Sequence, residues 1–251
     1  MSEAPAELVE RFGALTAEEL GRLDTAAVAA GVDVLQLMEI AGFQVARAAW
    51  TAIGEKSGAV NVVAGRGNNG GDGMVAARHL DAWGCTVTCI VIAEEAADVR
   101  GAAATQLAGL RGIDVDVAVT TDINVVRARA RESALVIDGL LGTGLHDAPR
   151  ERDAAAIDAL NGSGIPVLAI DVPSGLDATD GRTPGACVRA AGTVTLTAMK
   201  AGLWTARGRE QAGDVLVADI GMPAAAWRDA GLERPRDVVA GALLPVFATT
   251  P

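Results

Sequence analysis

The spacing of apolar residues along the chain changes near Gly58, and each side of this point has its own pattern. Before it, apolar side chains recur at helical intervals over residues 20–27 and again over about 34–53, which predicts two helices. Thr16 and Glu19 have the spacing of a capping box, in which a hydroxyl and a carboxylate satisfy backbone N–H groups at a helix start. We therefore expect the first helix to begin at this pair.

After Gly58, short apolar runs alternate with helical patterns. The runs are apolar at nearly every position, which is typical of strands that are buried on both faces of a parallel sheet. We expect such strands at residues 59–64, 85–93, 115–119, 134–138, 167–171, 193–196 and 215–219. The alternation predicts an α/β fold of the Rossmann-like type, with three αβα layers around a mostly parallel central sheet.

The chain shows no internal repeat and no long Ser/Gly linker that would separate two domains. Its 251 residues suit one sizeable α/β domain. We therefore assign residues 1–240 to a single domain. Residues 241–251 are weakly patterned, and we expect them to form a C-terminal extension or the remnant of a linker.

The composition argues against nucleic acid and membrane as partners. A formal net charge of −11 disfavours a polyphosphate partner, because nucleic-acid affinity depends on Lys and Arg side chains that neutralise phosphates. No apolar run approaches the length of a membrane span, and the polar N-terminus does not resemble a signal peptide. A small anionic ligand stays compatible with this charge, because backbone N–H groups alone can bind phosphate.

The three cysteines point to a reducing compartment. Cys85 and Cys89 have the even spacing that places two side chains on one face of a predicted strand. A metal site would need further ligands, and no His or second Cys pair stands near them in the sequence. We therefore expect ordinary buried thiols and a cytoplasmic protein.

The turn after the strand at 59–64 has the most unusual composition in the chain and reads GRGNNGGDG over residues 65–73. Gly65, Gly67 and Gly70 have the GxGxxG spacing of a dinucleotide-binding turn between a strand and a helix. Glycines let a ligand approach the backbone, and a helix N-terminus offers N–H groups to phosphate. The two Asn residues and the Asp add oxygens that an ordinary dinucleotide loop does not need. We interpret the segment as a binding loop rather than a tight turn with local Asx hydrogen bonds.

Two later predicted strands also end in turns that contain candidate catalytic or binding residues. Asp138 ends one strand and precedes a Gly-Thr-Gly segment at 142–144, although an Asp in this place also caps turns. Asp171 ends another, and Pro173 and Gly175 impose a turn after it. A carboxyl group at the rim of an apolar strand can have its pKa raised by desolvation, which suits acid–base catalysis. Because ligands of open α/β sheets bind beyond the carboxyl ends of strands, we expect the three turns to converge on one site.

Two basic side chains are weaker candidates. His146 lies in the turn that follows Asp138, where it is a candidate for ligand contact. Lys200 follows a further predicted strand, and it either pairs with a carboxylate, contacts the substrate or lies at the surface. The residues themselves leave these alternatives open.

The three turns, in this order, resemble those of the NAD(P)H-hydrate epimerase (YjeF N-terminal) family. The resemblance lies in NNGGDG at 68–73, DGLLGTG at 138–144 and DVPSGLD at 171–177. Supporting matches at 37–42, 200–203 and 213–223 extend it over about residues 23–223. It implies an isomerase of metabolite repair that interconverts the R and S forms of hydrated nicotinamide cofactors, NADHX and NADPHX. A separate ADP- or ATP-dependent dehydratase would then restore the cofactor from the S form.

The resemblance also implies roles for particular residues. Asp171 would be the catalytic acid–base group. A potassium ion would be held by Asn69, Asp138 and Ser174, whose oxygens are the ligands that hard cations prefer. The family also suggests a homodimer. The substrate would contact Asn68, Asn69, Gly70, Gly71, Asp72, Gly142, Thr143, Gly144, Leu145, His146, Asp147, Ala148 and Asp171.

Two other functions stay open at this point. One is a non-catalytic ligand-binding or scaffold module of the same fold. The intact set of candidate site residues argues against this alternative. The other is an ordinary NAD(P)-dependent dehydrogenase, in which Glu94 or Glu95 would hold a ribose. The dehydrogenase leaves the turns at Asp138 and Asp171 without a role, so we rank it last.

Overall fold

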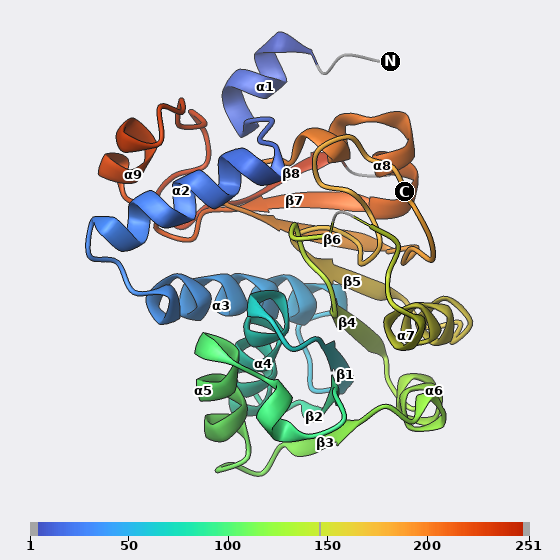
Figure 1. The fold of residues 1–251 in the computed structure, drawn as a ribbon. Helices are drawn as coiled ribbons and strands as arrows, with labels where there is room; N and C mark the ends of the chain where they lie inside the picture. The colour runs from blue at the N-terminus through green and yellow to red at the C-terminus, as the bar shows by residue number, and fades with distance from the viewer. Residues whose placement is uncertain (1–4, 146, 248–251) are drawn as a thin grey trace.

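The computed structural model describes residues 5–145 and 147–247, which form one sheet covered by helices on both faces (Figure 1). In this part of the chain eight strands pair in the order β3-β2-β1-β4-β5-β6-β7-β8. The strands from β1 to β7 run parallel, and β8 is antiparallel to β7. Their bounds are β1 Ala59–Ala64, β2 Thr86–Ile92, β3 Asp116–Thr120, β4 Leu135–Gly139, β5 Val167–Ile170, β6 Gly192–Leu196, β7 Asp214–Ala218 and β8 Leu243–Phe247.

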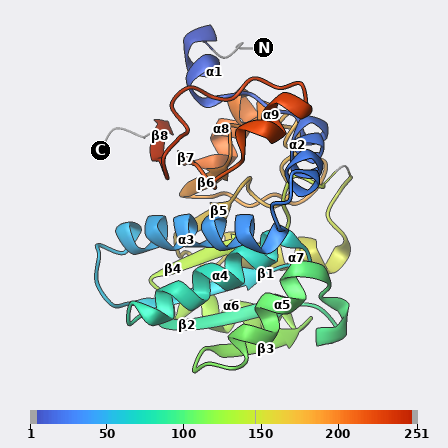
Figure 2. The ribbon, with the colours of Figure 1, turned by 90° about the vertical axis from the view of Figure 1, so that its left-hand side faces the viewer.

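The helices lie in two layers, as the αβα prediction requires. Helices α3, α4 and α5 cover one face of the sheet, and α6 and α7 cover the other (Figures 1 and 2). The bounds are α1 Ala6–Phe12, α2 Ala17–Ala29, α3 Val34–Ala52, α4 Asn68–Ala82, α5 Gly101–Leu110, α6 Ile123–Arg131, α7 Glu151–Asn161, α8 Ala206–Ala212 and α9 Ala224–Asp229. The predicted α/β fold is confirmed.

The predicted elements match the observed ones closely. Each predicted strand is present with its ends shifted by at most one residue. The capping box at the start of α2 is also present, with the Thr16 hydroxyl accepting from the Glu19 amide at 3.2 Å. Residues 96–110 form a short 3-10 turn, Ala96–Asp98, followed by α5, and the two are separate because Arg100 is extended and Gly101 has φ 61°.

The segment expected to be an extension or linker forms part of the sheet instead. Within it, β8 pairs with β7, and Leu244, Val246 and Phe247 pack against the core beside that strand. Pro245 is tolerated because β8 is an edge strand. At an edge, the N–H group that proline lacks would point to solvent and is not needed for pairing with the neighbouring strand. The described part of this segment therefore continues the fold.

The strand order has a switch point between β1 and β4. The chain moves outward from β1 to β2 and β3, and then returns to the other side of β1 as β4. The turns that leave β1 and β4 therefore diverge to opposite faces of the sheet, which opens a crevice at their carboxyl ends. The two backbones meet at its base, where the Gly65 amide donates to the Gly139 carbonyl at 2.9 Å.

Two expectations from composition can be compared with the structure. Cys85 and Cys89 are free thiols buried in the same core cluster, as predicted. None of the helices in the described ranges has the length and apolar character that a membrane crossing requires.

Candidate functional site

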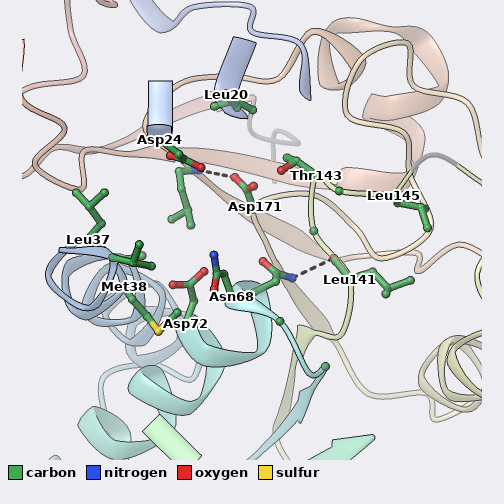
Figure 3. A pocket seen from close by; sticks show the side chains of 18 of the residues that line it. Leu20, Asp24, Leu37, Met38, Asn68, Asp72, Leu141, Thr143, Leu145 and Asp171 are labelled. Atoms are coloured by element: carbon green, nitrogen blue, oxygen red, sulfur yellow. Dashed lines mark hydrogen bonds between the residues drawn. The ribbon is translucent and has the colours of Figure 1, made fainter. Parts of the chain in front are cut away.

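A pocket of about 670 Å³ lies at the carboxyl ends of β1, β4, β5 and β6 (Figure 3). All three predicted turns contribute to its lining, through residues 65–69, 140–145 and Asp171. Helices α2 and α3 form another side with Leu20, Asp24, Leu37 and Met38, which are shown in Figure 3. The expected convergence of the three turns on one place is therefore confirmed.

The first predicted binding loop is partly a helix, because α4 begins at Asn68. Asn68, Asn69 and Asp72 line the pocket. Gly70 and Gly71 do not, and their lack of a side chain serves packing. A Cβ atom on Gly70 would lie 2.1 Å from the Gly65 carbonyl oxygen, and one on Gly71 would lie 2.6 Å from Met38.

The second turn lines the pocket over only part of its predicted range. Residues 142–145 face the pocket. Asp147 and Ala148 are exposed and are not among the lining residues. His146, the further candidate for ligand contact, lies outside the described residues.

Asp171 occupies an unusual backbone position directly after β5. Its φ is 68°, in the left-handed region that side chains other than Gly, Asn and Asp rarely adopt. The Leu196 amide donates to its Oδ1 at 3.1 Å, and the Lys200 ammonium forms an ion pair with it. With a side chain 14% exposed and facing the pocket, Asp171 is fixed on one side and accessible on the other. A positive φ at a residue other than Gly occurs often at functional sites.

Lys200 is the buried partner of Asp171, which confirms the predicted pairing with a carboxylate and excludes a position at the surface. Its side chain is 1% exposed. The ammonium also donates to the carbonyl oxygens of Leu196 at 2.6 Å and Ala198 at 3.2 Å. The buried charge therefore has both a carboxylate and two hydrogen-bond acceptors, as a buried ammonium requires.

Asp24 is a pocket residue that sequence reasoning missed. It extends from α2 into the open side of the pocket, near Asp171 (Figure 3). Surrounding protein, and then the charge of Asp171, raise the pKa of its carboxyl group to about 6, although Lys200 acts in the opposite direction. Its sequence position carries no signal, because a charged residue between apolar ones is normal in a surface helix.

Asp72 completes a group of acidic side chains in the pocket. Burial raises the pKa of its carboxyl group well above the usual value, and the charges of Asp171 and Asp24 add to this effect, while Lys200 opposes it. Carboxyl groups with such different surroundings in one pocket are typical of sites that transfer protons.

Beneath the pocket, Asn69, Asp138 and Ser174 meet around the backbone of Leu141. The Ser174 hydroxyl and amide donate to Asp138 at 2.6 and 2.9 Å, and the Leu141 amide donates to the Ser174 hydroxyl at 2.8 Å. The Asn69 side-chain amide donates to the Leu141 carbonyl at 3.0 Å. Three segments far apart in the sequence thus bring several oxygens together.

Asp138 in this group is a completely buried carboxyl group. Burial raises its pKa to about 6, although hydrogen bonds from Ser174 and from the Leu140 amide act in the opposite direction. No basic side chain in the described part of the chain forms an ion pair with it. A buried carboxylate held only by neutral donors favours a bound cation beside it.

Curated proteins similar to this chain include two kinds of relative. The bifunctional NAD(P)H-hydrate repair enzyme Nnr of Hyperthermus butylicus is 42% identical over 214 residues, which are 84% of this chain and 38% of that protein. The NAD(P)H-hydrate epimerase of Dehalogenimonas lykanthroporepellens is 34% identical over 222 residues, which are 87% of this chain and 86% of that protein. The chain therefore spans well under half of the bifunctional relative and most of the shorter one.

Structural comparison agrees with the sequence matches. The crystal structure of the yeast protein YNL200c superimposes with a TM-score of 0.79 at 25% identity, covering 93% of this chain and 99% of that one. Residues 34–202 match the family described as YjeF-related protein N-terminus, and this range contains all three turns of the pocket. The chain belongs to this family.

Proposed function

We propose that this protein is an NAD(P)H-hydrate epimerase, an isomerase that interconverts the R and S forms of NADHX and NADPHX. The observation that carries the proposal is Asp171, an ion-paired carboxylate in a left-handed backbone position that faces a large pocket at the switch point of the sheet. Relatives that bear this activity in their names, including one of similar length, support it.

The chemistry of the substrate suggests a mechanism that the pocket can perform. C6 of the hydrated ring is a hemiaminal carbon, so protonation of its hydroxyl and loss of water leave a ring cation stabilised by N1. Water that adds to the opposite face then gives the other epimer. Asp171 acts as an acid–base group in this exchange of protons, a role that typically contributes ~10²–10⁴-fold to the rate. Lys200 and the Leu196 amide hold the carboxylate in place.

The rest of the pocket suits a nucleotide. The first turn of α4 presents N–H groups without a side-chain cap, and Arg66 and Arg100 also line the pocket. A helix N-terminus and guanidinium groups favour the diphosphate of the substrate. Thr143 and its neighbours in the second turn then contact the remaining part of the molecule.

We propose potassium as the cation beside Asp138. Asn69, Asp138 and Ser174 would hold it, because amide, carboxylate and hydroxyl oxygens are ligands of hard cations and the buried carboxylate lacks a basic partner. The bound ion would balance the charge of Asp138 and order the turns that line the pocket. A coupled dehydratase, a homodimer and a cytoplasmic location remain predictions of the sequence.

The test of the proposed function is a coupled assay. Purified protein is mixed with the R epimer of NADPHX and an excess of an S-specific dehydratase, and recovery of NADPH is followed by absorbance. We expect recovery well above the rate of spontaneous epimerisation. Recovery at the spontaneous rate would contradict catalysis and leave the non-catalytic ligand-binding module as the better interpretation.

The potassium site gives a second prediction. At constant ionic strength, replacing Na⁺ by K⁺ should raise both the epimerase rate and the thermal midpoint of the wild-type protein. Asp138→Asn should abolish both responses, because a neutral amide does not attract the cation. Asp158→Asn, which alters an exposed carboxylate on α7, serves as the matched control and should respond like wild type. Equal responses to K⁺ in both variants would exclude Asp138 as a ligand.

A further inference from the structure

The proposed epimerisation requires proton transfer on both faces of the substrate ring, because water leaves from one face and returns to the other. Asp171 is held on one wall of the pocket by Lys200 and the Leu196 amide, so it would face one side of a ring bound there. We propose that Asp72 is the second proton-transfer group, acting on the face opposite Asp171. This inference rests on the proposed function and divides its chemistry between two carboxyl groups.

Asp72 is a buried carboxyl group without a protein partner. The residue is 8% exposed and lines the pocket from the second turn of α4. Among the described residues, nothing forms a hydrogen bond or an ion pair with its side chain, whereas Asp171 has both. Buried polar groups in proteins are normally hydrogen-bonded, so an unpartnered carboxyl group that faces a pocket is available to a ligand.

The two carboxyl groups face the pocket from different walls. Figure 3 shows Asp72 projecting from α4 on the side of Met38, and Asp171 projecting from the end of β5 on the side of Asp24. Close packing fixes α4 in this position, because Gly73 lies against Val62. A flat ring between the walls would present one face to each carboxyl group.

The surroundings of the two groups also differ in charge. Asp171 is paired with Lys200. Asp72 has an uncharged neighbour in Met38 of α3, and burial together with the charges of Asp171 and Asp24 raises its pKa well above the usual value, against the opposing effect of Lys200. These surroundings therefore favour the protonated form of Asp72. Two carboxyl groups in one pocket, one with a buried ammonium partner and one without any partner, have the different surroundings that an acid and a base need.

The reaction then balances without another reactant. The Asp72 carboxyl group gives its proton to the C6 hydroxyl, the C–O bond breaks with its electron pair on oxygen, and water leaves. A second water attacks C6 from the other face and gives a proton to the Asp171 carboxylate. The enzyme finishes with Asp72 ionised and Asp171 protonated, the form that catalyses the reverse direction. Exchange of protons with solvent through the open pocket restores the first form.

Kinetics of Asp72→Asn test this assignment in the coupled assay. We expect kcat to fall at least about 100-fold, while the Kd for NADPHX stays within about threefold, because the amide keeps the shape but cannot donate the required proton. Asp81→Asn, farther along α4, is the matched control and should keep wild-type kcat. An inactive wild-type protein would refute the proposed function and this inference together, whereas an active Asp72→Asn variant would refute only the inference.

Two further measurements separate proton transfer from a purely structural role. In the Asp72→Ala variant, added formate should restore kcat by at least about tenfold, because it supplies a carboxyl group to the vacated space. The wild-type kcat should fall as pH rises through the raised pKa of Asp72, since the acid acts only when protonated, and the variants should lack this decline. Loss of activity without formate rescue, or a loss that lies entirely in Kd, would overturn the assignment.

Discussion

Replacing Asp171 by Asn should lower the epimerase kcat by about 10²–10⁴-fold, which is the usual contribution of a general acid–base group. The same change should also destabilise the protein, because it leaves the Lys200 ammonium buried without its carboxylate. Breaking one partner of a buried pair typically costs about 3–5 kcal/mol. The kinetic and the structural effects therefore need to be separated.

The double variant Asp171→Asn/Lys200→Met provides that separation. Methionine fills the space of the lysine stem without a charge, so the double variant should recover much of the lost thermal stability. It should not recover activity, because no carboxyl group stands at the end of β5. Steady-state kinetics with calorimetric unfolding of the wild type and of both variants measure the two effects. A double variant with nearly wild-type kcat would remove Asp171 from the catalytic role.

Replacing Gly65 by Ala should strongly destabilise the protein. A Cβ atom at this position would lie 1.9 Å from the Leu140 carbonyl oxygen, where the turns after β1 and β4 meet. Both sides of this contact are backbone, so neither can move without disturbing the paired strands. We expect a loss of more than about 3 kcal/mol in the free energy of unfolding, beyond the usual cost of overpacking.

Gly67→Ala is the matched control in the same turn. A Cβ atom at Gly67 meets nothing within 4 Å, and its φ of −104° is open to any residue. Its cost should stay below about 1 kcal/mol. Chemical denaturation of the two variants gives the comparison, and equal losses would show that the close approach at Gly65 does not limit this fold. Of these two glycines in the GxGxxG segment, only Gly65 is required by close packing of the backbone.

The geometry of the second strand bears on the dehydrogenase alternative. Glu94, which would hold the ribose in that case, is 71% exposed and lies 3.9 Å from Arg152. Neither Glu94 nor Glu95 lines the pocket. The pocket is instead lined by the turn that follows Asp138 and by Asp171, and a hydride transfer would give neither of these carboxyl groups a role.

Local sequence determined the elements and the place of the site. Apolar runs define the strands because a parallel sheet is buried on both faces, and the Gly-rich turn after β1 follows from the close approach of the backbone at Gly65 and Gly70. Since parallel strands end at one edge of a sheet, the turns after β1, β4 and β5 were predictable as one site. The role of the segment around β8 was not predictable, because pairing with β7 depends on a partner edge that its own pattern does not contain.

Only the tertiary structure decided which side chains work together in the pocket. In the sequence, Asp24 has the pattern of any surface residue of a helix, and Lys200 is compatible with three interpretations. Packing in the folded chain places both near Asp171. Asp72 appeared as one oxygen donor in a loop, whereas in the structure it is a buried carboxyl group without a partner. Protonation and catalysis depend on burial and on charges from distant segments, and these quantities exist only after the chain has folded.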